Sequence, residues 1–153
     1  MDPMTLRGAT LDDAEVIAAY NAAMAYETEH KRLDPPTLRS GVERAIRQPE
    51  LARYFLAEQA GRVVGQLMIT TEWSDWRDGV FWWIQSVYVH PDARGLGVFK
   101  ALYRHVEAIA RAKGDVCGLR LYVEHENGRA QDVYRKLGMR DAGYLVYEVE
   151  WKE

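Results

Sequence analysis

A strand-like run that passes into a glycine-rich turn and then a helix is the segment of this sequence best suited to bind an anion. It reads Val87-Tyr88-Val89-His90-Pro91-Asp92-Ala93-Arg94-Gly95-Leu96-Gly97. Residues without side chains let backbone N–H groups approach an anion closely, and a helix N-terminus adds positive dipole charge. Lys100 and Arg104 follow further along the same helix. The segment therefore predicts a loop that binds a pyrophosphate.

The spacing of the glycines argues against two other kinds of nucleotide loop. Lys100 stands where the dinucleotide-binding fingerprint has its third glycine, and no Gly-Lys-Ser/Thr follows as in a P-loop. By itself, a pair of glycines before a helix is equally compatible with an ordinary turn. The elements around Gly95 and Gly97 must therefore support the assignment.

Hydrophobic periodicity and turn residues predict these surrounding elements. The strands expected are 4–10, 54–57, 63–69, 80–89, 119–123 and 145–151. The helices expected are 11–29, 35–49, 97–114 and 127–137. Their order is β-α-α-β-β-β-α-β-α-β, which predicts an α/β fold of the mixed α+β kind, with a central mixed sheet flanked by helices on both faces. We expect one domain over residues 1–153, with its ligand at the junction 89–97.

The whole pattern resembles the GCN5-related N-acetyltransferase (GNAT) superfamily over residues 4–151. The coenzyme A signature of that family corresponds to Arg94-Gly95-Leu96-Gly97-Val98-Phe99, in which Phe99 replaces the final small residue. A second family pattern corresponds to Asn127, Ala130, Tyr134 and Gly138-Met139, in which Met139 replaces an aromatic residue. The resemblance implies an acyl-CoA N-acyltransferase-type fold, with acetyl-CoA (coenzyme A) as cofactor.

The resemblance also implies roles for individual residues. The loop and first helical turn would bind the cofactor through Arg94, Gly95, Leu96, Gly97, Val98, Phe99 and Lys100, and the preceding strand would bind pantetheine through backbone groups of Val87, Tyr88 and Val89. Asn127 would hydrogen-bond the pantetheine region. Tyr134 would lie beside the thioester sulfur. A phenol with a pKa near 10 is protonated at neutral pH and can protonate a departing thiolate.

The sequence does not single out a general base or an acceptor site. Gln85 and Ser86 lie where many family members place a glutamate, and neither is a base at neutral pH. The carboxylates expected to bind or deprotonate an amine are Glu27, Glu29, Glu72 and Asp75, with Glu29 and Glu72 as candidate catalytic residues; Glu124 and His125 are weaker candidates. The alternative for each is a solvated surface position, which carboxylates commonly occupy.

Four tryptophans gather near the predicted acceptor side, at positions 73, 76, 82 and 83. Trp83 and Gln85 are candidate substrate-binding residues. Aromatic faces attract ammonium groups, although core packing or a homodimer interface explains the tryptophans equally well. The resemblance implies an N-acetyltransferase in which a primary amine of a small molecule or peptide attacks acetyl-CoA directly. A non-catalytic acyl-CoA-binding module, an O-acyltransferase and a longer-chain acyltransferase remain alternatives.

Composition limits the possible partners. A net charge of -3 and a pI near 5.8 disfavour nucleic acid and anionic membranes. The single cysteine, Cys117, excludes an internal disulfide and is expected to be buried. His30, His90 and His105 lack metal-ligand spacing, so we assign no metal. The absence of a signal peptide pattern or long apolar stretch leads us to expect a cytoplasmic protein.

Overall fold

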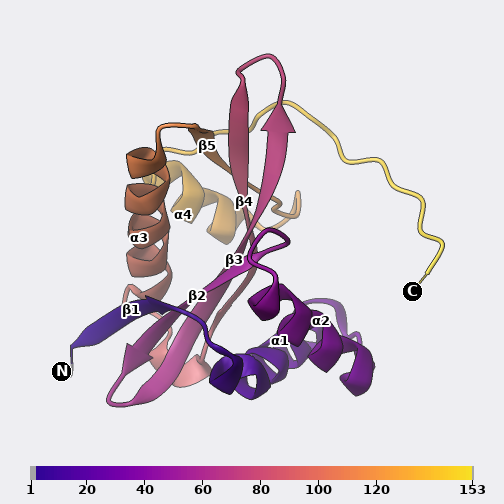
Figure 1. The fold of residues 1–153 in the computed structure, drawn as a ribbon, viewed down its shortest axis with the longest axis vertical. Helices are drawn as coiled ribbons and strands as arrows, with labels where there is room; N and C mark the ends of the chain where they lie inside the picture. Colours follow the sequence, from indigo (N-terminus) through magenta and orange to yellow (C-terminus); the bar gives the residue numbers. More distant parts are fainter. Residues whose placement is uncertain (1–2, 153) are drawn as a thin grey trace. The chain divides into compact units, whose positions relative to one another are not determined.

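The computed structural model describes residues 3–152 and divides into two compact units, one ending at Leu121 and the other beginning at Tyr122. Within the described part of the first unit, the strands form a five-stranded sheet in the order β1-β2-β3-β4-β5 (Figure 1). The first four strands pair antiparallel, whereas β5 runs parallel to β4. This mixed sheet confirms the predicted fold class. The expectation of a single domain stays a prediction.

The elements follow the predicted order as far as α4. The strands are β1 (Met4–Gly8), β2 (Arg53–Gln59), β3 (Arg62–Ser74), β4 (Gly79–Val89) and β5 (Val116–Leu121). The helices are η1 (Leu11–Asp13), α1 (Ala14–Glu29), α2 (Pro35–Arg47), η2 (Pro91–Ala93), α3 (Val98–Lys113) and α4 (Gly128–Lys136).

Local sequence signals account for several boundaries. The side chain of Asp34 accepts a hydrogen bond from the Thr37 N–H at 3.2 Å and so caps α2, which begins with two prolines. Ala60 and Gly61 have φ values of 52° and 74° and form the tight turn between β2 and β3. These turn and cap residues confirm the second helix and the predicted hairpin.

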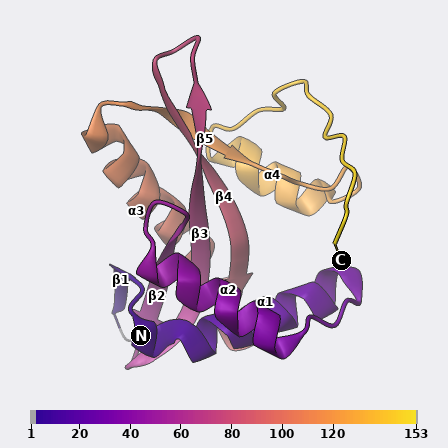
Figure 2. The ribbon, with the colours of Figure 1, turned by 45° about the vertical axis from the view of Figure 1, so that its right-hand side comes forward.

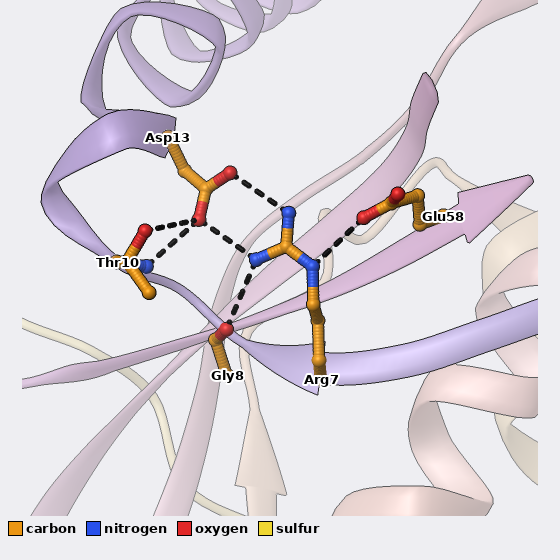
Figure 3. Close-up of polar contacts among 5 residues, drawn as sticks. All are labelled: Arg7, Gly8, Thr10, Asp13 and Glu58. Atoms are coloured by element: carbon orange, nitrogen blue, oxygen red, sulfur yellow. Dashed lines mark hydrogen bonds and ion pairs between the residues drawn. The ribbon is translucent and has the colours of Figure 1, made fainter. Parts of the chain in front are cut away.

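An ion-pair cluster around Arg7 joins β1, η1 and β2 (Figure 3). The Arg7 guanidinium donates to both carboxylate oxygens of Asp13, at 2.8 and 2.9 Å, and to Glu58 at 2.8 Å. The Thr10 N–H also donates to Asp13, at 2.7 Å. The hydrogen bonds from Arg7 hold the pKa of the Asp13 carboxyl below its ordinary value. Asp13 therefore links the start of α1 to the edge of the sheet.

Helices cover both faces of the sheet in the first unit (Figure 2). Successive residues of a strand point to opposite faces. On one face, Tyr54 and Leu56 belong to a buried cluster with Ile17 of α1 and Val42 of α2. On the other face, Phe55 lies against His105 of α3, with ring centroids 5.7 Å apart.

The hairpin of β3 and β4 is the longest element of the sheet, and its tip projects from the rest of the unit (Figure 1). Asp78 at the tip has a φ of 48°, which agrees with the predicted Asp78-Gly79 turn. The tryptophans of this hairpin differ in exposure: Trp73 and Trp76 are 62% and 86% exposed, whereas Trp82 is 3% exposed. The hairpin therefore distributes the tryptophans between solvent and core.

The second unit contains α4 and a C-terminal segment without strand pairing. The predicted strand 145–151 is wrong, because these residues form no strand in the described structure. Leu145, Tyr147, Val149 and Trp151 are 68%, 90%, 68% and 89% exposed. Alternation of apolar residues favours an extended chain, but a strand also needs a neighbour for its backbone hydrogen bonds.

Candidate active site

The predicted anion-binding loop forms the connection between β4 and α3. Gly95 and Gly97 have φ values of 79° and 80°, in the left-handed region that glycine adopts without strain. A Cβ built on either glycine would meet nothing within 4 Å, so the surface beside their backbone is open. Gly97 is the N-cap of α3 and provides no side chain to cap the first N–H groups. The loop thus presents backbone donors at a helix N-terminus, as the sequence predicts.

Close packing fixes the start of α3 against β3. A Cβ on Gly65 would lie 2.5 Å from a methyl group of Val98, the first residue of α3. A residue with a Cβ would have to push Val98 away, because Cβ atoms in proteins essentially never lie within 3.0 Å of another heavy atom. Phe99 is half-buried and its ring lies 6.2 Å from that of Tyr103. The larger side chain at this signature position therefore packs along the helix.

Arg94 is bound to residues of β4 and α1. Its guanidinium donates to the Val89 carbonyl and to Glu27, both at 2.9 Å, and lies 5.3 Å from the centroid of the Tyr88 ring. Tyr88 also donates its hydroxyl to Glu27. The hydrogen bonds from Tyr88 and Arg94 lower the pKa of the Glu27 carboxyl. Glu27 therefore positions Arg94 at the start of the loop, a contact the sequence did not indicate.

The end of β4 that leads into this loop has one edge without a strand partner among the described residues. Pairing with β5 ends at Ile84 and Leu121, although β4 continues to Val89. On the other edge, the register with β3 shifts between Gln66 and Met68, which pair with Tyr88 and Gln85. Ser86 in this bulge has a φ of 52°. Apart from the Val89 carbonyl, which accepts from Arg94, the backbone groups on this side of residues 87–89 are thus available to an extended ligand.

Three predicted acceptor-side residues lie on β3 and β4, near the projecting hairpin. Trp83 donates its indole N–H to Glu72 at 3.3 Å, and Arg120 of β5 donates to the same carboxylate at 2.6 Å. Gln85 donates to the Thr70 hydroxyl at 2.7 Å. Trp83 and Gln85, two residues apart on one strand, face the same side of the sheet. The sequence did not indicate Arg120, which shares one oxygen of the Glu72 carboxylate with Trp83.

The predicted acids do not converge on one place. Glu27 binds Tyr88, while Glu72 pairs with Phe81 across the β3–β4 ladder. Tyr88 and Phe81 are seven residues apart on one strand, which separates them by roughly 23 Å. Glu29 at the end of α1 and Asp75 at the hairpin tip are exposed. Within the described structure, the four carboxylates therefore do not form a single cluster.

The second unit holds the two remaining candidates. Asn127 caps α4, because its side-chain oxygen accepts a hydrogen bond from the Ala130 N–H at 3.1 Å. Tyr134 on α4 is half-buried, and burial raises the pKa of its hydroxyl. Tyr134 is therefore protonated at neutral pH, as a proton donor must be. Its role in the reaction stays a prediction, as does the contact of Asn127 with pantetheine.

Two residues assigned lesser roles also have defined positions. Cys117 is exposed, so the expectation that it is buried is wrong. It lies on β5, which pairs with only β4 among the described residues, and an outer strand leaves more of its side chains open to solvent. His90 accepts a hydrogen bond from the Asp92 N–H at 3.1 Å and thereby shapes the start of η2.

The described residues contain neither a metal-binding group of side chains nor a membrane-spanning helix. No three His, Cys, Asp or Glu side chains in residues 3–152 gather as a metal-binding group. None of the helices in that part of the chain has both the length and the apolar character that a membrane span requires.

Comparison with known sequences places the chain among acetyltransferases. Residues 15–139 match the acetyltransferase (GNAT) family. Thialysine N-epsilon-acetyltransferase from Bos taurus is 36% identical over 80 residues, which are 52% of this chain and 45% of that protein. The match thus spans less than half the length of this relative.

Solved structures agree with the family match. A possible acetyltransferase from Clostridium difficile 630 has a TM-score of 0.91 and 39% identity, covering 98% of this chain and 99% of that chain. A predicted acetyltransferase from Clostridium acetobutylicum, solved with acetyl-CoA, has a TM-score of 0.76 and 16% identity, covering 95% and 96%. The latter supports the fold alone. Because the family match spans most of the sequence, the chain belongs to the acetyltransferase (GNAT) family.

Proposed function

We propose that this chain is an N-acetyltransferase that transfers an acetyl group from acetyl-CoA to a primary amine by direct attack in a ternary complex. The observation that carries the proposal is the open loop at the N-terminus of α3, with Gly95 and Gly97 in left-handed conformations. Such a loop suits the pyrophosphate of coenzyme A. Members of the GNAT family use this cofactor for acetyl transfer.

The shape and charge of the loop support binding of a coenzyme A pyrophosphate. The open surface beside Gly95 and Gly97 admits an anion, and the first turn of α3 contains no acidic residue to repel it. We expect the N–H groups of the loop and first turn to bind the pyrophosphate, with Lys100 adding positive charge. When bound, acetyl-CoA supplies an activated thioester.

The free edge of β4 is proposed to bind the pantetheine arm. Backbone groups of Val87, Tyr88 and Val89 lie beyond the last pair with β5 and are suited to hydrogen-bond an extended amide chain. An N–H in this stretch is also suited to stabilise negative charge on the reacting carbonyl oxygen. This function requires a fixed backbone, whereas the side chains are free to pack elsewhere.

Tyr134 is proposed to donate the proton that the departing thiolate needs. Burial raises the pKa of its hydroxyl, which keeps the proton in place until the thiolate forms. No covalent acyl-enzyme is required by this scheme, because the amine attacks the thioester directly. Cys117 is therefore given no role as a nucleophile.

The acceptor is proposed to be a small molecule or peptide with a primary ammonium group. The indole of Trp83 and the carboxylate of Glu72 lie together on one side of the sheet, and both groups attract cations. The name of the Bos taurus relative, a thialysine N-epsilon-acetyltransferase, supports an amine on a short aliphatic side chain. Glu72 and Glu29 are the proposed residues to bind or deprotonate this amine.

A screen of acceptors tests the proposal. Acetyl-CoA would be incubated with thialysine, lysine, aliphatic diamines and amino-terminal peptides, and free thiol and acetylated product would both be measured. We expect acceptor-dependent thiol release with at least one primary amine. Hydroxyl analogues of the best amine provide the control. Transfer to the hydroxyl compounds alone, or acetyl-CoA binding without any transfer, would contradict N-acetylation.

A further inference from the structure

A glutamine is fully buried beneath the bulge in β4. Gln66 has no exposed surface and lies within the apolar run of β3. Its side-chain Nε2 donates to the Asn21 side-chain oxygen at 2.8 Å and to the Ser86 backbone carbonyl at 3.1 Å. One amide group therefore connects α1, β3 and the bulge.

The stability of the core does not explain this glutamine. Its Oε1 is buried and has no hydrogen-bond partner among the described residues. A buried polar atom without a partner destabilises the folded state, and an apolar side chain of similar size would avoid that loss. The contribution of Gln66 must therefore come from the two bonds that its Nε2 makes.

One of these bonds is to a residue with an unfavourable backbone conformation. Ser86 has a φ of 52°, which a residue with a Cβ adopts only when its surroundings enforce it. The Gln66 amide donates a hydrogen bond to the carbonyl of this residue. A bulge also changes the direction of the strand that follows it. Here the strand that follows is residues 87–89, whose outer edge is free of β5.

We propose that Gln66, held by Asn21, is a positioning residue that clamps the Ser86 carbonyl and so aims the backbone N–H groups of Val87 and Val89, on the edge of β4 away from β3, at the acyl donor. This inference rests on the proposed function, which assigns those groups to pantetheine and the reacting carbonyl. Gln66 itself does not touch the reacting atoms. Its effect is transmitted through the backbone of β4.

The first experiment separates positioning from stability. Gln66→Met keeps the size of the side chain but removes the donor to Ser86. We expect kcat to fall about 10- to 100-fold, because small displacements of reacting groups have effects of that size. Val42→Ala, in the core between α1 and α2, is the matched control: it should lower the melting temperature with kcat unchanged.

Rescue provides a readout that a packing defect would not give. Glycine adopts the Ser86 conformation without strain, so Ser86→Gly should favour the bulge even without the clamp. We expect the double variant Gln66→Met/Ser86→Gly to recover at least several-fold in kcat over Gln66→Met alone. Asn21→Ala, which frees the Gln66 amide to rotate, replaces Gln66→Met if that variant does not fold.

Amide hydrogen exchange in the unliganded protein tests the clamp independently of turnover. We expect exchange at Tyr88, whose N–H lies on the β3 side of the strand, to be at least 10-fold faster in Gln66→Met, with β2 unaffected, and slower again in the double variant. Unchanged exchange at Tyr88 would overturn the clamp. Faster exchange with unchanged kcat would overturn the positioning role. If the wild type acetylates no acceptor, the proposed function fails, whereas the exchange result still decides the clamp.

Discussion

Replacing Gly97 with alanine tests the pyrophosphate loop directly. Gly97 has a φ of 80°, and a Cβ there would point into open space beside the loop. Left-handed backbone costs an L-residue about 1–2 kcal/mol, so Gly97→Ala should lower the melting temperature by roughly 2–8 °C in a chain of this size. The same methyl group would obstruct the approach of a phosphate to the backbone.

Gly114 provides a matched control at the other end of the same helix. It caps the C-terminus of α3 with a φ of 79°, and a Cβ there would also meet nothing within 4 Å. The two glycines are about 25 Å apart along the helix. Gly114→Ala should therefore cause a similar loss of stability without any effect at the loop.

Calorimetric titration with acetyl-CoA distinguishes the two variants. Hydrogen bonds to a charged group contribute about 1.5–3 kcal/mol, which corresponds to a roughly 10- to 150-fold change in Kd. We expect Gly97→Ala to weaken binding by at least about 10-fold and Gly114→Ala to leave Kd within about twofold of the wild type. Equal affinities in the two folded variants would refute the assignment of the loop.

Three further predictions concern the reaction and the stability of the fold. Tyr134→Phe should lower kcat about 10²- to 10⁴-fold when chemistry limits the rate and leave the Kd for acetyl-CoA nearly unchanged. Steady-state kinetics would measure kcat and calorimetry would measure Kd; an unchanged kcat would remove Tyr134 from the reaction. Glu72→Gln and Glu29→Gln should raise KM for a cationic amine, or lower kcat where one of them is the base, and spare acetyl-CoA binding; unchanged acceptor kinetics in both variants would make these acids surface residues. Asp13→Asn should lower the free energy of unfolding by about 1–3 kcal/mol at pH 7, because it weakens the charged bonds to Arg7. The folded-state pKa of Asp13 is depressed, so its contribution is present above the unfolded pKa and is lost as the pH falls below about 4. Denaturant unfolding at pH 7 and pH 3 checks this, since the difference between wild type and Asp13→Asn should shrink at the lower pH.

The sequence by itself determined the elements that depend on local signals. The caps and prolines of the first two helices, the Ala60-Gly61 turn and the apolar stripe of α3 all act within a few residues of one another. The loop of Gly95 and Gly97 belongs to the same class, because a glycine at a helix start is required by the local backbone. Periodicity and turn chemistry therefore predicted the order of elements as far as α4 and the position of the glycine-containing loop before α3.

Some predictions failed because they needed a distant partner. The alternating residues 145–151 satisfy the pattern of a strand but have no ladder among the described residues. Cys117 was expected to be buried from its residue type, whereas its position on β5 exposes it. Neither the pairing of a strand nor its place in a sheet is encoded in the residues of that strand alone.

Only the tertiary structure decided which polar groups meet. Glu27 and Glu72 are equivalent acids in the sequence, yet one binds Arg94 and Tyr88 while the other binds Arg120, because α1 packs near one end of β4 and β5 pairs with the other. The bulge at Ser86 contains no glycine that would indicate it in the sequence. Gln66 and Asn21, from elements far apart in sequence, meet beside it because α1 is buried on the sheet.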